Sequence, residues 1–172
     1  MYNGRTFSLL YINFVVILET WRWKFLGFQS EAEGRPVQIW FDNLPQEDRE
    51  EIVDLLDYIR NTTSRPWPKK VFDSLEGEGG ISELKMDNIR CFRDGEVKEI
   101  TYRIYGFFGP KQYEHTYTFL HGTAKDAKND KIGKQIAKGR LDEITRGAAG
   151  VHKFDFSNSP DSTPKEKPRR PN

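Results

Sequence analysis

Cysteine and the signatures of the common catalytic sites are almost absent from this chain. The single cysteine, Cys91, excludes an internal disulfide and a cysteine-rich zinc cluster, and it fits a reducing compartment. The sequence has no P-loop, no G-x-S-x-G elbow, no H-E-x-x-H and no zinc-ligand spacing. The glycines of 77–80 lack the Lys-Ser/Thr pair and the following helix that bind phosphate, so we interpret this segment as a flexible turn. We therefore expect neither a metal nor a small-molecule cofactor.

The composition indicates one globular domain. Of 172 residues, 36% are hydrophobic, 13% aromatic and 31% charged, and the mean hydropathy is -0.75. The aromatic content argues against wholesale disorder, and the length suits a single core. We expect the domain to span residues 21–154, between an apolar extension at 1–20 that need not be the native start and a disordered, proline-rich tail at 155–172.

The most apolar run, 7–18, is too short to cross a membrane. A spanning helix needs roughly 20 apolar residues, whereas this run contains polar residues and ends at Glu19. A secretory signal is a second interpretation because Arg5 precedes the run, but no small-residue cleavage site follows it. A third is that the residues before about Val16 derive from upstream sequence. We expect a cytoplasmic protein without a membrane segment.

Hydrophobic periodicity predicts an α+β fold in which helices lie on a sheet. The expected order is an N-terminal strand, a helical hairpin, an antiparallel sheet of three to four strands and a C-terminal helix. We place the strands at 21–28, 81–92, 97–108 and 116–121, the hairpin helices from Pro36 and Pro45, and the last helix at 130–144. Asp94-Gly95 is a hairpin signal between two of the strands.

Charge is distributed unevenly although the formal net charge is only +1. Residues 31–60 contain nine acidic and three basic residues, whereas residues 121–146 contain seven basic and four acidic ones. Such an asymmetry can steer a polyanion to one face of a protein. RNA is a suitable polyanion, because its own 2′-hydroxyl can attack the phosphodiester without a cofactor.

RNA cleavage requires a base for that hydroxyl, cations for the phosphorane oxygens and a proton for the departing 5′-oxygen. Histidine and lysine can transfer the protons, arginine and lysine can bind the phosphate, and tyrosine can stack on a base. The stretch from Tyr102 to Lys128 holds each of these residue types. The candidate catalytic residues are Arg103, His121 and Lys125, and the candidate RNA-binding residues are Lys85, Tyr105, Lys128, Lys131, Lys134 and Lys138.

Each candidate also has a purely structural interpretation. Arg103 alternates with Ile104 along its strand and could simply be solvated. His121 has the same strand parity as Tyr117 and Phe119, so it could be a half-buried structural histidine. The lysines from 125 onward, spaced by about three residues, could form an ordinary exposed turn and helix face.

Five motifs in order make the chain resemble the RelE/ParE toxin superfamily, and within it the HigB-like and phage-derived toxins of type II toxin–antitoxin systems. The resemblance covers roughly residues 21–146. The motifs are Pro36-Val-Gln-Ile-Trp-Phe-Asp-Asn-Leu-Pro45, Gly80-Ile-Ser-Glu-Leu-Lys85, Tyr102-Arg-Ile-Tyr-Gly-Phe-Phe-Gly-Pro110, Phe119-Leu-His-Gly122 and Ala137-Lys-Gly-Arg-Leu-Asp-Glu-Ile144.

The resemblance implies a small RelE-like toxin that cleaves messenger RNA on the ribosome, without a metal ion, and so inhibits translation. It implies that Arg103 holds the scissile phosphate, that His121 or Lys125 transfers protons, and that Lys85 ends the preceding strand beside them. The lysine-rich helix would then contact ribosomal RNA. The implied partner is a cognate antitoxin, typically with a helix-turn-helix domain.

Two alternatives stay open. Lys125 is followed by Asp126 where the family often has a second lysine. This difference favours a non-catalytic toxin of the ParE kind that binds gyrase. The other alternative is an inactive phage-derived relative that keeps only its antitoxin-binding helices.

Overall fold

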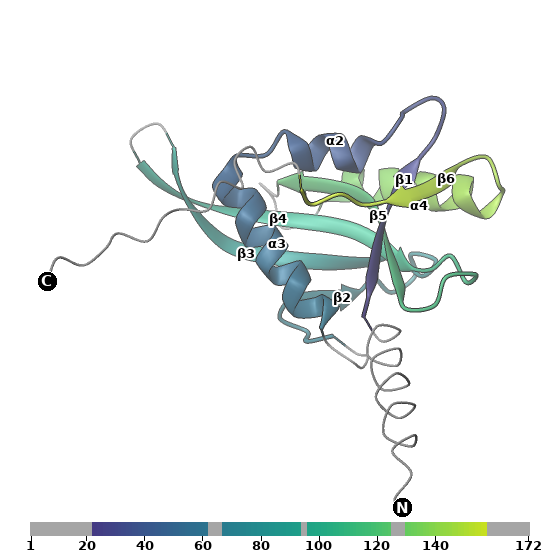
Figure 1. The fold of residues 1–172 in the computed structure, drawn as a ribbon, viewed down its shortest axis with the longest axis horizontal. Coiled ribbons are helices and arrows are strands. Elements are labelled where there is room, and N and C mark those ends of the chain that lie inside the picture. The colour runs from purple at the N-terminus through teal and green to yellow at the C-terminus, as the bar shows by residue number, and fades with distance from the viewer. Residues whose placement is uncertain (1–21, 62–66, 94–95, 125–129, 158–172) are drawn as a thin grey trace, which may run out of the picture.

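A computed structural model of the chain describes residues 22–61, 67–93, 96–124 and 130–157 (Figure 1). These residues form a mixed α+β fold of three helices and one six-stranded sheet. The elements in chain order are β1 (Lys24–Gln29), α2 (Pro36–Asp42), α3 (Gln46–Arg60), β2 (Phe72–Ser74), β3 (Ser82–Arg93), β4 (Glu96–Phe108), β5 (Thr116–Ala124), α4 (Lys131–Thr145) and β6 (Gly150–Lys153). The α+β class predicted from the sequence is confirmed.

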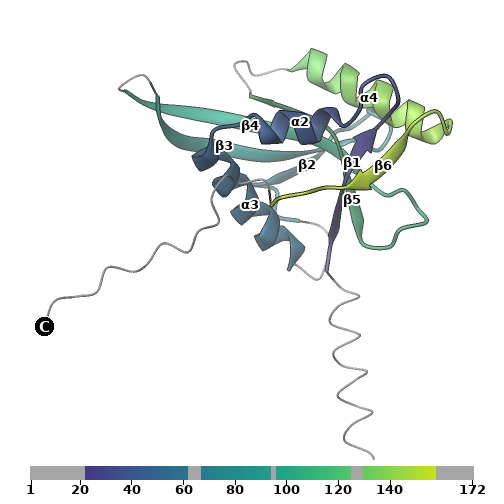
Figure 2. The same cartoon turned by 45° about the horizontal axis from the view of Figure 1, so that its top comes forward.

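The sheet has the strand order β2-β3-β4-β5-β1-β6. Strands β3, β4 and β5 form the antiparallel meander that the sequence predicts. The first strand lies between β5 and β6 and runs parallel to β5, with Phe25 opposite Tyr117. A parallel neighbour needs a long crossover, which here comprises α2, α3 and three strands. The long β3–β4 hairpin projects beyond the helices (Figure 2).

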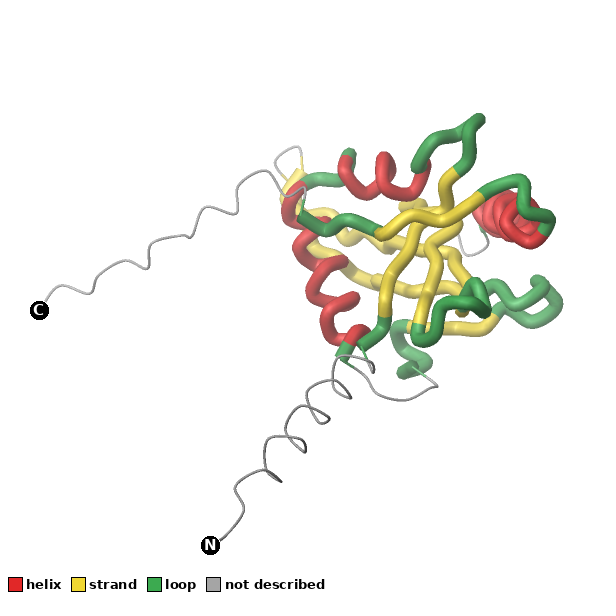
Figure 3. The backbone as a smooth tube through the Cα atoms, turned by 45° about the vertical axis from the view of Figure 1, so that its right-hand side comes forward, coloured by secondary structure: helices red, strands yellow, loops and turns green. Residues whose placement is uncertain are grey.

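Helices cover both faces of the sheet. Figure 3 shows α3 and α4 on opposite sides of the strands. Residues of even number in β4, such as Ile104, pack with α2 and α3, whereas Tyr105 packs with Ala137 of α4. This division follows from the alternation of side chains along a strand. The alternation of side chains along the strands therefore produces two separate cores, one on each face of the sheet.

The larger core, beneath α2 and α3, is built mainly from aromatic rings. Phe119 is fully buried at its centre, with its ring stacked on Phe25 at 5.4 Å and edge-on to Phe154 at 4.9 Å. Trp67 meets Trp23 in a T-shaped contact at 4.9 Å. Edge-to-face and offset stacked pairs of this kind contribute beyond the area they bury.

A polar contact crosses this core between α3 and the sheet. The Tyr102 hydroxyl of β4 donates a hydrogen bond to the carboxylate of Asp48, and both residues are buried. Asp48 lies in the first turn of α3, where the helix dipole favours a negative charge. The guanidinium of Arg49 donates to the carbonyl of Asp42 at 2.9 Å and joins α3 to the end of α2. The two helices predicted as a hairpin are thus fixed to each other and to β4.

The sequence did not predict β2 and β6, the two edge strands. They contain only 3 and 4 residues, too few to show an alternating pattern. Their pairing depends instead on neighbours distant in sequence, since β6 lies antiparallel to β1 with His152 opposite Gly27. The extension at 1–20 and the tail beyond 157 lie outside the described residues, as does the predicted hairpin turn at 94–95.

Phe119→Ala should lower the free energy of unfolding by about 3–5 kcal/mol, because it removes a buried ring and leaves a cavity. Urea denaturation measures the change. Ile132→Ala is the matched control, since Ile132 is exposed on α4 and its truncation should change stability by less than about 0.5 kcal/mol. Equal stability of the two variants would contradict a core centred on Phe119.

Candidate functional site

A bulge in β5 decides which face of the sheet His121 occupies. Tyr105 pairs with His121, but the next residue of β4, Gly106, pairs with Phe119, so Leu120 is an extra residue on β5. An extra residue interrupts the alternation of side chains. His121 consequently lies on the α4 face beside Tyr105, and not with Phe119 in the larger core. The parity shared with Phe119 in the sequence therefore gave the wrong face.

Strand pairing places Arg103 among residues of β3 on the same face. Arg103 lies opposite Lys85 of β3 and Thr123 of β5, and Tyr105 lies opposite Glu83. We call Glu83, Lys85, Asp87, Arg103, Tyr105 and His121 the polar face. It contains four of the nine site residues predicted from the sequence: Lys85, Arg103, Tyr105 and His121.

Arg103 is buried rather than solvated, with 7% of its surface exposed. Its Nη1 donates to Oδ1 of Asp87 at 2.7 Å, and its Nε lies 3.9 Å from Oε1 of Glu83 without a hydrogen-bond partner. Removing a charge from water is costly unless it is paired. The two carboxylates are what allow a guanidinium to lie inside this face.

Glu83 joins the two cations of the polar face. It is 8% exposed, and its Oε1 lies 3.8 Å from Nζ of Lys85 as well as 3.9 Å from Nε of Arg103. Lys85 also pairs with Asp73 of β2 at 2.8 Å. Sequence reasoning did not identify Glu83 as a site residue. The available signal was its strand parity with Lys85 inside the Glu-Leu-Lys motif.

The ring of His121 lies parallel to the ring of Tyr105, with an interplanar angle of 3° and 6.4 Å between centroids. Burial lowers the pKa of His121, and the positive charge of Arg140 lowers it further, against the opposing effects of Asp130 and Glu33. The imidazole is therefore neutral at physiological pH. A neutral imidazole with one free nitrogen can accept a proton.

Tyr105 lies beneath the start of α4 and is only 1% exposed. Burial raises the pKa of its phenol, and the negative charges of Asp130 and Glu83 raise it further. A Cβ on Gly133 would lie 2.9 Å from Cε2 of Tyr105, so a glycine is needed for the first turn of α4 to approach this closely. The ring of Tyr105 consequently has no face open to a nucleotide base. The sequence-based hypothesis, in which Tyr105 stacks on a base, requires such an open face.

Arg140 of α4 binds the backbone of the bulge in β5. Its Nη1 donates to the carbonyl of Leu120 at 2.7 Å, and its guanidinium pairs with Glu33 and lies 5.3 Å from the centroid of the Phe28 ring. Arg140 thus satisfies the carbonyl of the extra residue and contributes to the low pKa of His121. The sequence placed Arg140 in a motif but assigned no role to it.

The lysines of α4 lie off the buried side of the helix. Gly133, Ala137 and Arg140 form the buried side of this helix, whereas Lys131 and Lys138 are exposed and Lys134 is partly exposed. Lys125 and Lys128, predicted for proton transfer and RNA binding, lie outside the described residues.

No protein-family model, curated protein or solved structure matches the chain. Among the described residues, no group of three or more His, Cys, Asp or Glu side chains could hold a metal ion. Within the same part of the chain, no helix has the length and apolar character needed to cross a membrane. The candidate site must accordingly be judged on its own geometry.

Acidification should destabilise the protein through His121 and His152, whose pKa values are both lowered, chiefly by burial. A histidine in the unfolded chain binds its proton near pH 6.5. The contribution of the two neutral histidines to stability is therefore fully present above that pH and falls as the pH drops below it. Urea denaturation at pH 7.5 and pH 5.5 measures the loss.

The double variant His121→Gln, His152→Gln should lose less stability over that interval. Asp73 and Asp155 do not interfere, because hydrogen bonds with Lys85 and Ser157 lower their pKa values below 3.8. Their contribution to stability is therefore lost only below about pH 4. An unchanged difference between the two pH values in the double variant would show that other groups cause the acid sensitivity.

Proposed function

We propose that the chain is a RelE/ParE-like toxin and that its polar face cleaves messenger RNA on the ribosome. The observation that carries the proposal is the gathering of a neutral His121, the cations Arg103 and Lys85, and the carboxylate of Glu83 on one sheet face. These are the groups that a cofactor-independent phosphodiester cleavage requires. The order of strand, two helices, antiparallel meander and helix also supports it.

In the proposed reaction, His121 accepts the proton of the 2′-hydroxyl and the 2′-oxygen attacks phosphorus. The bond from phosphorus to the 5′-oxygen breaks, and that oxygen takes a proton from the ammonium of Lys85. The products are a 2′,3′-cyclic phosphate and a 5′-hydroxyl. Arg103 and His121 are diagonal neighbours on adjacent strands, roughly 7–8 Å apart, so a phosphate can lie between them.

Arg103 must exchange a carboxylate for the phosphate in this reaction. Its hydrogen-bond partner Asp87 has a side chain that is 48% exposed, so water can solvate that carboxylate once the phosphate takes its place. Glu83 stays beside the guanidinium and holds it at the sheet surface. The exchange keeps Arg103 paired before and after substrate binds.

The polar face alone does not attract RNA strongly. Glu83, Asp87 and the adjacent Asp73 supply three carboxylates against the two cations Lys85 and Arg103. Affinity for a phosphate backbone comes from the number of cations that contact it. We therefore assign backbone binding to Lys131, Lys134 and Lys138 of α4 and the chemical step to the polar face. A cognate antitoxin, most simply one with a helix-turn-helix domain, would silence the toxin.

Induced expression of the chain should arrest translation and cut transcripts. Arg103→Lys keeps the buried charge but loses the planar guanidinium, and it should abolish the arrest and the cuts. Arg146→Ala, at an exposed position just beyond α4, is the matched control and should behave as the parent. Sequencing of transcript 5′ ends and incorporation of labelled amino acid measure both effects. Intact transcripts with induction of the DNA-damage response would support the gyrase-binding alternative instead.

His121→Gln should lower the cleavage rate about 10²–10⁴-fold while leaving RNA affinity unchanged, because it removes only the proton acceptor. In the parent, the rate should fall on acidification as His121 becomes protonated at a pH below 6.5. Single-turnover cleavage and filter binding separate the two properties. Equal loss of affinity and rate would assign His121 to RNA binding and not to proton transfer.

A further inference from the structure

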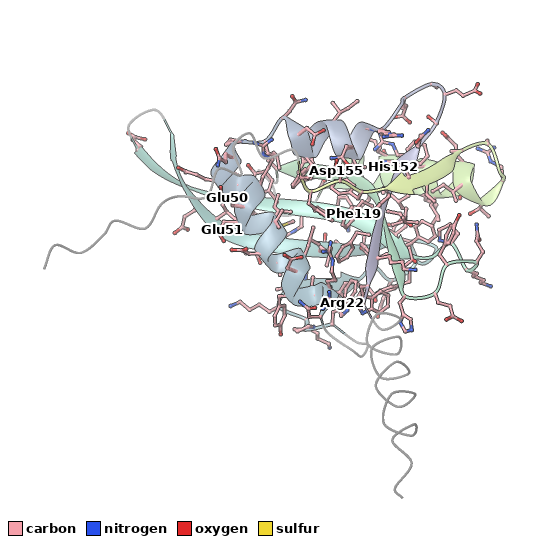
Figure 4. All side chains as sticks on the ribbon, in the orientation of Figure 1. Arg22, Glu50, Glu51, Phe119, His152 and Asp155 are labelled. Atoms are coloured by element: carbon pink, nitrogen blue, oxygen red, sulfur yellow. The ribbon has the colours of Figure 1, made fainter. Side chains whose placement is uncertain are left out.

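A groove of about 860 Å³ lies at the edge of the sheet, beside the first half of β1. Strand β6 pairs with Leu26–Gln29, and the chain then turns away toward α2. There the side-chain amide of Gln38 holds the backbone of Asp155, donating to its carbonyl at 2.8 Å and accepting from its N–H at 2.9 Å. Figure 4 shows His152 and Asp155 near α2 and Arg22 at the start of β1. At the start of β1 the N–H of Trp23 donates to the carbonyl of Arg60 at 3.3 Å, and the carbonyl of Phe25 accepts from the N–H of Phe154 at 3.1 Å. The groove beside these residues has the size typical for small ligands.

Aromatic rings line this groove from three segments of the chain. They are the side chains of Trp23, Phe25, Tyr113, Phe154 and Phe156. Trp23, Phe25 and Phe154 are buried and belong to the core, whereas Tyr113, in the loop between β4 and β5, is 48% exposed. The groove therefore has a rigid aromatic floor and one ring at its rim that is free to pack on a ligand.

Three cations accompany the rings. The guanidinium of Arg60 lies 5.6 Å from the centroid of Phe25 and 5.3 Å from that of Phe156. Lys24 and Lys153 are exposed at the rim, on the same side of the sheet because Lys153 lies opposite Leu26.

One acidic residue, Asp155, lines the groove. Its carboxylate accepts from the N–H of Ser157 at 2.8 Å and from the hydroxyl of the same residue at 2.6 Å. Nη1 of Arg60 already pairs with Oδ1 of Asp57 at 3.2 Å. The two exposed lysines, against one carboxylate that already has partners, therefore give the groove its positive potential.

We propose that this groove binds a nucleotide unit, with the base against the rings of Tyr113 and Phe156 and the phosphate at Lys24 and Lys153. Rings and cations in one groove suit a ligand that is both planar and anionic. A purely apolar ligand would leave the two lysines unmatched. The groove shares no residue with the polar face, so this site stands independently of the proposed cleavage.

Binding is tested on the full chain with two probes, uridine monophosphate by calorimetry and a labelled hexauridylate by fluorescence anisotropy. The double variant Lys24→Glu, Lys153→Glu should weaken binding at least tenfold, and Tyr113→Ala should weaken it at least fivefold through loss of a stacking ring. Lys70→Glu, an exposed lysine outside the groove, is the matched control and should bind as the parent. Saturable binding of the mononucleotide would assign a free nucleotide, and binding of the hexamer alone would assign an RNA strand.

Three results overturn the proposal. Neither probe binds; the groove variants bind as tightly as the parent; or Lys70→Glu weakens binding as much as they do. Arg103→Lys provides a further control, because it should abolish cleavage and leave groove binding intact. If Arg103→Lys abolishes binding and the groove variants do not, the nucleotide belongs to the polar face.

Discussion

The bulge at Leu120 is the constraint on which the candidate site depends. By adding one residue to β5, it turns His121 away from the aromatic core and toward Tyr105 and α4. The cost of the interrupted ladder is offset on the α4 side, where Arg140 binds the Leu120 carbonyl. The same guanidinium helps to keep His121 neutral. One irregularity thus fixes the position of the histidine and places it where burial and Arg140 lower its pKa.

Burial determines the chemistry of the polar face more than its net charge does. Arg103 and Glu83 are both more than nine-tenths buried, and each lies beside the opposite charge of the other. Breaking such a pair costs more than the pair contributes, because the remaining charge is left uncompensated. Arg103 is therefore held in one orientation, which is what binding a phosphate in a defined geometry requires. The α4 lysines are exposed and have no such restriction.

The sequence predicted the elements well where periodicity is strong. Helices from Pro36 and Pro45, the three strands of the meander and the last helix lie within a few residues of their predicted bounds. Strand alternation also placed Arg103 and Tyr105 on one face. It gave the wrong face for His121, because a bulge leaves no mark in the hydrophobic pattern, although the histidine is partly buried as its structural interpretation expects. It gave no sign of β2 and β6, whose pairing depends on contacts distant in sequence.

The sequence by itself determined the α+β class and which residue types are available for chemistry, because local periodicity and composition are properties of the chain. The tertiary structure alone decided that Arg103 is buried against Glu83, that Tyr105 is covered by α4 and that His121 is neutral. It also decided that β1 lies between β5 and β6 and that an aromatic, cationic groove lies beside its first half. These features arise where segments far apart in the chain meet. Burial and electrostatic environment exist only after that packing has formed.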